Sequence, residues 1–305
     1  TRGSLPTRGS LPTRGSLPNK GSLPIELKGN TNETTLAYLE NELIIRGIGK
    51  EEFGLLLKSK KITELIIPDS VTSIDKNAFS SCNSLKSVII PNSVTSIGRS
   101  AFWGCISLEK IEIPNSVTSI GYSTFGGCSS LKEIKIPSVT SIEEAAFYNC
   151  SSLKSVIIPN SVTTIGKSSF YNCSSLKETE IPNSVSSISE EAFFSCFSLE
   201  KIEIPNSVKT IGDTVFSYCS RLESVIIPNS VTSIGKGAFD NCTSLKKIII
   251  PNSLTTIGVS AFSSCSSLES VIIQESVKTI GKGAFSFCSS LQSVIIPNSL
   301  TTIDD

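Results

Sequence analysis

The sequence predicts an α/β repeat solenoid with one parallel β-sheet, and with short extended segments and single helical turns on its other side. The first observation is a fixed period: ten cysteines are separated by eight gaps of 23 residues and one of 22. The second is a motif that recurs with them, of which one copy runs from Leu85 to Cys105. Such a period indicates stacked copies of one supersecondary unit. A solenoid grows by adding coils, so 305 residues need no second core.

Each copy is expected to begin with a short β-strand. In the copy above, Val88 and Ile90 alternate with Ile89, which places the first two in the core and Ile89 in solvent. Pro91 has no N–H to donate and ends the strand, and the Asn-Ser pair after it supplies turn residues. We expect about twelve strands in a sheet roughly 55 Å from end to end.

A single helical turn is expected later in each coil, where it would carry a buried Ala-Phe pair such as Ala101 and Phe102. The residue that begins this segment is usually glycine, aspartate or serine, which are favoured at helix N-caps. Glu143 departs from the pattern, and its coil is the 22-residue one, which lacks the turn asparagine before Ser138. The N-cap candidates are Asp75, Gly98, Gly121, Gly166, Ser189, Gly212, Gly235, Gly258 and Gly281.

The cysteines occupy the same slot in every coil, so they should stack in one internal column. Side chains in register point the same way, which disfavours disulfide bridges between neighbours. The chain has no histidine, the usual companion of cysteine in zinc sites. We therefore predict buried free thiols, no metal site and no cofactor. The cysteines are Cys82, Cys105, Cys128, Cys150, Cys173, Cys196, Cys219, Cys242, Cys265 and Cys288.

The chain divides into three parts. Residues 1–24 repeat the hexapeptide Thr-Arg-Gly-Ser-Leu-Pro with one variant copy, and their glycines and prolines predict an extended, polyproline-like tail. Residues 25–61 are predicted to form an N-terminal capping coil, because residues 42–47 resemble the strand segment at 64–69. Residues 62–305 are the predicted solenoid, expected to lack a C-terminal cap.

The repeat resembles the BspA-like class of leucine-rich repeats, which has a 23-residue period and a cysteine slot. The residues that carry the resemblance read Ile-Pro-Asn-Ser-Val-Thr-Ser-Ile-Gly-x-x-Ala-Phe-x-x-Cys-x-Ser-Leu. It covers residues 62–305, fades over 25–61 and excludes the tail. It implies a leucine-rich-repeat solenoid and a non-enzymatic, cell-surface or secreted module for adhesion and for binding host or matrix proteins. It supplies no catalytic residues and identifies no partner.

Two outward columns are candidate binding surfaces. One is an apolar stripe on the predicted concave sheet face, formed by Ile226, Ile249, Ile272 and Ile295. Four isoleucines in consecutive strands form a patch, although duplication of a β-favouring residue that touches no partner explains them equally well. The other is an aromatic column suited to protein or sugar contacts, or to stacking that only stiffens the solenoid. It consists of Trp103, Tyr148, Tyr171 and Phe194.

Charged residues in other strands alternate in sign between neighbours, as Glu112 and Lys135 do, and predict a solvated face that supports the register. Glu180 beside Glu203 is a like-charge pair, which either costs slightly or awaits a cation or basic partner. The whole chain has 27 basic and 27 acidic residues, which disfavours nucleic acid. No window is apolar enough for membrane insertion. No histidine and no phosphate-binding loop are present, so catalysis finds no support.

Two other functions remain open. The first is a self-assembling structural subunit of a filament or surface layer, in which the tail contacts a neighbouring subunit. Tail leucines would lie on the isoleucine stripe and tail arginines would meet acidic strands. The second, ice binding through a threonine column, is disfavoured because Ser186, Lys209 and Lys278 interrupt that column. The tail contacts would be Leu5, Leu11, Leu17, Arg2, Arg8 and Arg14, and the threonines are Thr72, Thr95, Thr118, Thr140 and Thr163.

Overall fold

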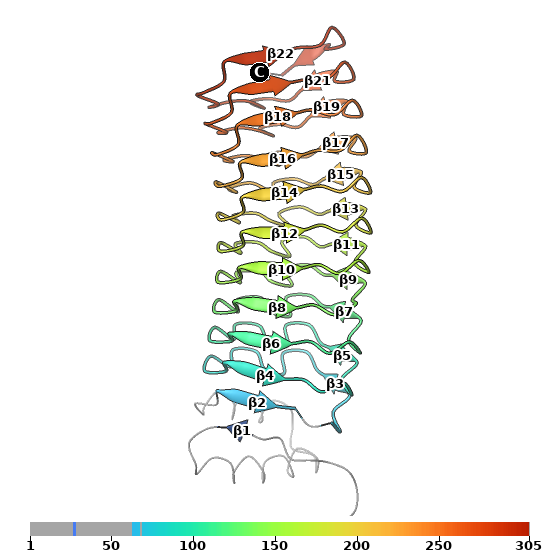
Figure 1. Ribbon diagram of the computed structural model, residues 1–305, viewed down its shortest axis with the longest axis vertical. Helices are drawn as coiled ribbons and strands as arrows, with labels where there is room; N and C mark the ends of the chain where they lie inside the picture. The colour runs from blue at the N-terminus through green and yellow to red at the C-terminus, as the bar shows by residue number, and fades with distance from the viewer. Residues whose placement is uncertain (1–26, 29–62, 68, 305) are drawn as a thin grey trace, which may run out of the picture.

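The computed structural model describes residues 27–28, 63–67 and 69–304, which form a single stack of coils (Figure 1). Each coil contributes one three-residue strand to what we call the front wall. The strands stack in parallel and in register, for example Val88 beside Ile111. Only β1, Leu27–Lys28, runs antiparallel, to β2. The front-wall strands are β2 Glu64–Ile66, β4 Ser87–Ile89, β6 Lys110–Glu112, β8 Glu133–Lys135, β10 Ser155–Ile157, β12 Glu178–Glu180, β14 Lys201–Glu203, β16 Ser224–Ile226, β18 Lys247–Ile249, β20 Ser270–Ile272 and β22 Ser293–Ile295.

A second wall of two-residue strands corrects the prediction of one sheet. The segments expected only to be extended lie in register on their copies in the next coil, and their backbone groups pair between coils, as Ile165 does with Ile188, except between β5 and β7. Extended segments stacked in this way form a ladder whatever their length. The second wall comprises β3 Ser73–Ile74, β5 Ser96–Ile97, β7 Ser119–Ile120, β9 Ser141–Ile142, β11 Thr164–Ile165, β13 Ser187–Ile188, β15 Thr210–Ile211, β17 Ser233–Ile234, β19 Thr256–Ile257, β21 Thr279–Ile280 and β23 Thr302–Ile303.

The predicted helical turns were wrong, because the described residues contain no helix. Two residues of each coil in this region adopt left-handed backbone conformations, such as Ser100 with φ 54° and Gly104 with φ 69°. N–H groups then alternate between partners. Ala101 donates within its coil to Gly98 at 3.1 Å, whereas Phe102 donates to Thr124 of the next coil at 2.9 Å. A helix would keep all these bonds within its own segment, whereas this arrangement links the coils.

The glycine column assigned to helix N-caps has a different physical role. A Cβ atom built on Gly258 would lie 2.6 Å from the carbonyl oxygen of Gly235 in the preceding coil. At Gly98 the nearest atom would be the backbone nitrogen of Lys76, at 2.5 Å. At Gly98 and Gly258, glycine is therefore required because two backbones approach closely.

We expect Gly258→Ala to lower the free energy of unfolding by about 1–3 kcal/mol, because the new methyl group must displace backbone rather than a flexible side chain. Gly121→Ala is the matched control. A Cβ there would meet its nearest neighbour, the Thr124 hydroxyl oxygen, at 3.5 Å, so the expected change is within about 0.5 kcal/mol. Urea unfolding followed by circular dichroism measures both. Equal effects would contradict the explanation.

A phenylalanine column forms the centre of the core between the walls. Adjacent rings lie parallel within 19°, with centroids 5.2–5.6 Å apart. Offset stacking at this spacing is favourable beyond the area that it buries. The column comprises Phe79, Phe102, Phe125, Phe147, Phe170, Phe193, Phe216, Phe239, Phe262 and Phe285.

The cysteine column lies beside the phenylalanines, and its predicted burial is confirmed for nine of the ten free thiols, with Cys288 partly exposed. Each thiol after the first donates a hydrogen bond to a phenylalanine carbonyl of the preceding coil. Cys173, for example, donates to Phe147 at 3.3 Å. The same carbonyl accepts the N–H of Cys150 at 3.2 Å. Burial raises the pKa of the Cys150 thiol to about 12, so these thiols are structural groups rather than nucleophiles.

The 22-residue coil is one residue shorter at the turn that follows its front-wall strand. In a regular coil Val94 donates to the carbonyl of Pro91 across a four-residue turn at 3.1 Å, whereas Val139 donates to Pro137 across three residues at 2.7 Å. The front-wall ladder continues past this coil without a slip, with Ile134 beside Val156. The missing turn asparagine therefore shortens the corner and leaves the strands in register.

Candidate functional site

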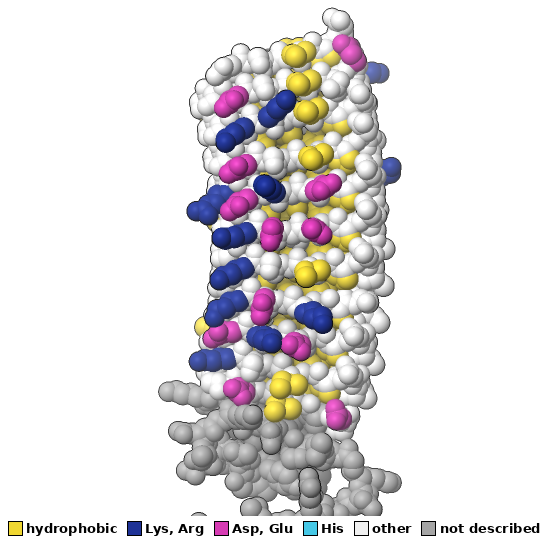
Figure 2. Space-filling view, in the orientation of Figure 1, with side chains coloured by type: hydrophobic (Ala, Val, Ile, Leu, Met, Phe, Trp, Pro, Cys, Tyr) yellow, Lys and Arg dark blue, Asp and Glu magenta, His cyan; other side chains and the backbone are white. Residues whose placement is uncertain are grey.

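The front wall exposes the first and last residue of each strand, and the last residues form the column that contains the isoleucine stripe. Ile226 is 66% exposed, Ile249 50% and Ile295 60%, and Ile272 is partly exposed. Ile249, Ile272 and Ile295 are direct neighbours in the strand ladder. Figure 2 shows the resulting line of apolar side chains towards the C-terminal end of the front wall. Ile226 occupies the same position in the preceding strand, although β16 and β18 are not hydrogen-bonded to each other, so the four residues form one aliphatic row over four successive coils.

Charged residues occupy the same outward column elsewhere. Glu112 and Lys135 are neighbours in the ladder, as predicted from their positions. Lys110, however, forms its ion pair within its own strand, with Glu112 at 3.2 Å. Beside this column, Lys132 donates to Glu109 at 2.6 Å and holds the pKa of that carboxyl below its usual range. These pairs are exposed, so they support the register more than they add stability.

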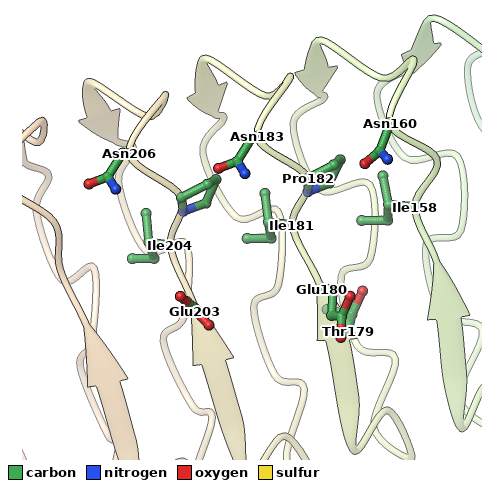
Figure 3. Close-up of a pocket in the computed structure, with 11 residues that line it drawn as sticks. Ile158, Asn160, Thr179, Glu180, Ile181, Pro182, Asn183, Glu203, Ile204 and Asn206 are labelled. Atoms are coloured by element: carbon green, nitrogen blue, oxygen red, sulfur yellow. The ribbon is translucent and has the colours of Figure 1, made fainter.

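The like-charge pair, Glu180 and Glu203, marks an interruption of the front wall. The ladder from β10 to β12 is complete, as is that from β14 to β16, but β12 and β14 are not hydrogen-bonded to each other. A groove of about 440 Å³ lies at this point (Figure 3). The sequence revealed the two carboxylates but not the groove. It is lined by Ile158, Asn160, Thr179, Glu180, Ile181, Pro182, Asn183, Glu203, Ile204, Pro205 and Asn206.

The aromatic column is a stack in the segment with left-handed backbone conformations, which we call the turn side of the solenoid. The Tyr148 and Tyr171 rings lie 4.8 Å apart, as do those of Tyr171 and Phe194. Tyr218, from the neighbouring column, tilts onto Phe194 at 5.5 Å and was missed from the sequence. Because the rings cover each other's faces, they present mainly edges to solvent, which favours the stiffening interpretation over sugar stacking.

Trp103 does not join this stack. Gly126 occupies the intervening coil, and a Cβ atom there would lie 3.1 Å from Cδ1 of Trp103, so the indole lies against the glycine. The Trp103 side chain remains 47% exposed. The glycine in the column was the signal in the sequence that the aromatic row is broken.

The threonine column lies on the second-wall side, and its hydroxyls bond to the solenoid itself. Thr95 donates to the carbonyl of Thr72 at 3.3 Å, and Thr163 donates to that of Thr140 at 3.4 Å. These hydroxyl hydrogens are already used between coils, which adds to the interruptions of the column as an argument against ice binding.

Several sequence predictions lie outside the described residues. They are the tail, with its proposed contact residues Leu5, Leu11, Leu17, Arg2, Arg8 and Arg14, and almost all of the capping coil at 25–61. In the part of the chain that the structure describes, no three carboxylate or thiol side chains gather as metal ligands would. The described residues also include no helix with the length and apolarity to cross a bilayer.

A short parallel strand preceded by a buried leucine, such as Leu108, and repeated in every coil defines a leucine-rich-repeat protein. The profile of the BspA type leucine rich repeat region matches residues 48–156, 140–230 and 209–305, in six copies. The chain therefore belongs to the BspA-type leucine-rich-repeat family.

Solved structures include several similar proteins. A leucine-rich repeat protein from Bacteroides ovatus is 30% identical over 80% of this chain and 85% of its own, with a TM-score of 0.49. A leucine rich cell surface protein from Faecalibacterium prausnitzii is 30% identical over 77% and 83%, with a TM-score of 0.45. The leucine rich repeat protein of T. pallidum is 33% identical over 53% and 79%, with a TM-score of 0.50. No curated protein matches the chain.

Proposed function

We propose that this chain is a non-enzymatic binding and adhesion module, displayed at the cell surface or secreted, which contacts a protein partner through the isoleucine stripe. Family membership supports a binding function, because leucine-rich-repeat proteins generally bind other proteins. The Faecalibacterium relative, which is described as a cell surface protein, supports the location. The partner class, a host or matrix protein, follows from the family resemblance.

The observation that carries the proposal is the exposed aliphatic row over four consecutive strands. The alternative is that isoleucine is present only because it favours strands. Glu112, Lys135, Glu180 and Glu203 occupy equivalent positions in the same wall. The wall therefore forms without isoleucine there, so strand formation alone does not require the row. An aliphatic patch that excludes water at its centre is typical of binding surfaces.

We expect the double variant Ile249→Lys, Ile272→Lys to weaken binding to immobilised extracellular-matrix proteins at least about tenfold, because two lysines would have to be desolvated at the centre of the contact. Surface plasmon resonance of the full chain measures this. The matched control is Ile89→Lys with Ile157→Lys, two exposed isoleucines outside the stripe. Undiminished binding by the stripe variant, with the thermal midpoint retained, would exclude the stripe as the contact surface.

A self-assembling structural subunit is a second candidate function. The observation that favours it is charge complementarity between the tail and the rest of the chain. Residues 1–24 contain four basic residues and no acid, which leaves 23 basic and 27 acidic residues, a net charge of −4, in the rest of the chain. Light scattering of the full chain over a range of concentrations tests it, since association must increase with concentration.

A further inference from the structure

The groove between β12 and β14 differs from the equivalent positions of the other coils in its residues. Among the described strands, the front-wall ladder is interrupted at two places, here and between β16 and β18, so the residues and not the interruption alone distinguish the groove. The inward residue of β12 is Thr179, where other front-wall strands have leucine, valine or isoleucine. Its buried hydroxyl donates to the carbonyl of Val156 at 3.1 Å, on the side away from β14. Thus β12 is hydrogen-bonded to β10 and β14 to β16, but β12 and β14 are not hydrogen-bonded to each other across the groove.

The chemistry of the groove suits one long basic side chain. Glu180 and Glu203 end adjacent strands, both are exposed, and neither has an ion-pair partner among the described residues. Strands in a sheet lie about 4.8 Å apart, so the two carboxylates repel each other until a cation lies between them. Figure 3 shows the apolar floor beyond them, with Ile181 and Pro182, and the row of asparagines on the far rim.

An arginine matches this arrangement better than a metal ion or a lysine. Its planar guanidinium has five donors, enough to bond both carboxylates and the asparagine amide oxygens of the rim. Its aliphatic stem can pack on the isoleucine and proline floor while the charge stays near solvent. The volume, about 440 Å³, is at the lower end of the range for ligand sites.

The next strands towards the C-terminus carry the isoleucine stripe, so the wall offers two acids followed by four isoleucines in one column. Two strand spacings are about 9.6 Å, and three residues of an extended polyproline-like chain advance about 9.3 Å. A segment with arginine and leucine three positions apart can therefore place the arginine between Glu180 and Glu203 and the leucine between Ile226 and Ile249.

We propose that this groove and the adjoining stripe bind the Arg-Gly-Ser-Leu segments of the N-terminal hexapeptides of a second copy of the chain. The proposal rests on the second candidate function above. Every hexapeptide from residue 1 to 18 has this spacing, with Arg2 and Leu5 as the first pair. Strand β1, which follows the tail, pairs with β2 at the opposite end of the front wall from the stripe (Figure 1). A tail that leaves one end and binds near the other joins copies head to tail, which is the geometry of an open filament.

The test is sedimentation equilibrium of the full chain at about 0.15 M and about 0.5 M salt. We expect the wild-type chain to associate, and Glu180→Gln with Glu203→Gln to weaken association at least about tenfold and remove most of its salt dependence. Glutamine preserves the shape of the side chain and removes the repulsion, so folding should be unaffected. The matched control is Glu133→Gln with Glu178→Gln, two front-wall glutamates outside the groove.

Exchanging the charges of the groove and the tail is a more specific test. A chain with Glu180→Lys and Glu203→Lys should not associate, and adding Arg2→Glu, Arg8→Glu and Arg14→Glu to it should restore association. A wild-type chain that stays monomeric at all concentrations would overturn both this proposal and the self-assembly function. Association that is indifferent to the groove variants would overturn the groove as the tail site and leave self-assembly standing.

Discussion

Replacing Phe193, one of the fully buried phenylalanines of the inner column, by alanine is expected to lower the free energy of unfolding by about 3–5 kcal/mol. The ring is fully buried, and it stacks between Phe170 at 5.3 Å and Phe216 at 5.6 Å. Its removal leaves a cavity that rigid neighbouring coils cannot close. It also removes stacking on both sides. Urea unfolding measures the loss.

Phe194→Ala is the matched control, because it removes the same group from the next position along the chain. Phe194 is only half-buried and stacks in the outer aromatic row. We expect a loss of about 1 kcal/mol. Hydrogen exchange should show that Phe193→Ala opens the coils on either side of it before the rest, since each coil contacts only its neighbours. Equal losses for the two variants would contradict the central role of the inner column.

Raising the pH above about 9 is expected to unfold the protein cooperatively, because the buried thiols cannot ionise in place. Burial raises the pKa of Cys150 to about 12 and moves those of Cys128, Cys173 and Cys196 in the same direction. An unfolded thiol ionises near pH 8.5. The stabilisation is therefore complete below about pH 8.5 and is lost as the pH rises towards the folded-state pKa. Burial also raises the pKa values of Cys219, Cys242 and Cys265, and these seven thiols together would cost roughly 10 kcal/mol near pH 9.5, which is comparable with the whole stability of a domain.

Circular dichroism and urea unfolding from pH 7 to 11, with a reductant present, measure this effect. The double variant Cys173→Ala, Cys196→Ala isolates the thiols from lysine and tyrosine, which also titrate in this range. Above about pH 9.5, its stability should fall by roughly 3 kcal/mol less per pH unit than that of the wild type, whatever the variant costs at pH 7. A stability independent of pH up to 10.5 would show that the thiols ionise without penalty.

The period of the sequence was sufficient to predict the stack, the inward residues of the front wall and the buried cysteine column. The turn side was predicted wrongly for a definable reason. Glycine, serine and asparagine are favoured both at helix N-caps and in left-handed backbone conformations. In addition, Glu191, Thr214 and Tyr218 adopt left-handed conformations here with no sequence signal at all. Bonds within the coil alternate here with bonds to the next coil, and no single-coil pattern contains the second set.

Part of the candidate site could also be predicted from the sequence and part could not. The isoleucine stripe and the pair of Glu180 and Glu203 are visible in sequence, because solvent-facing positions of a strand follow from alternation. The groove is not, since it is lined by residues of three successive coils and lies where β12 and β14 are not hydrogen-bonded, and neither property is visible in the pattern of one coil. Thr179 was the one available signal, a hydroxyl at a position where its counterparts are aliphatic.

The shortened corner at Pro137 separates two properties that are coupled in most proteins, chain length and strand alignment. A deletion inside a strand would reverse which side chains face solvent, whereas this one leaves both neighbouring ladders unchanged. The fold therefore tolerates insertions and deletions at the corners better than inside the strands. For an engineer, the same corners are the places to graft a foreign peptide loop, which would be displayed beside the front wall without altering its surface.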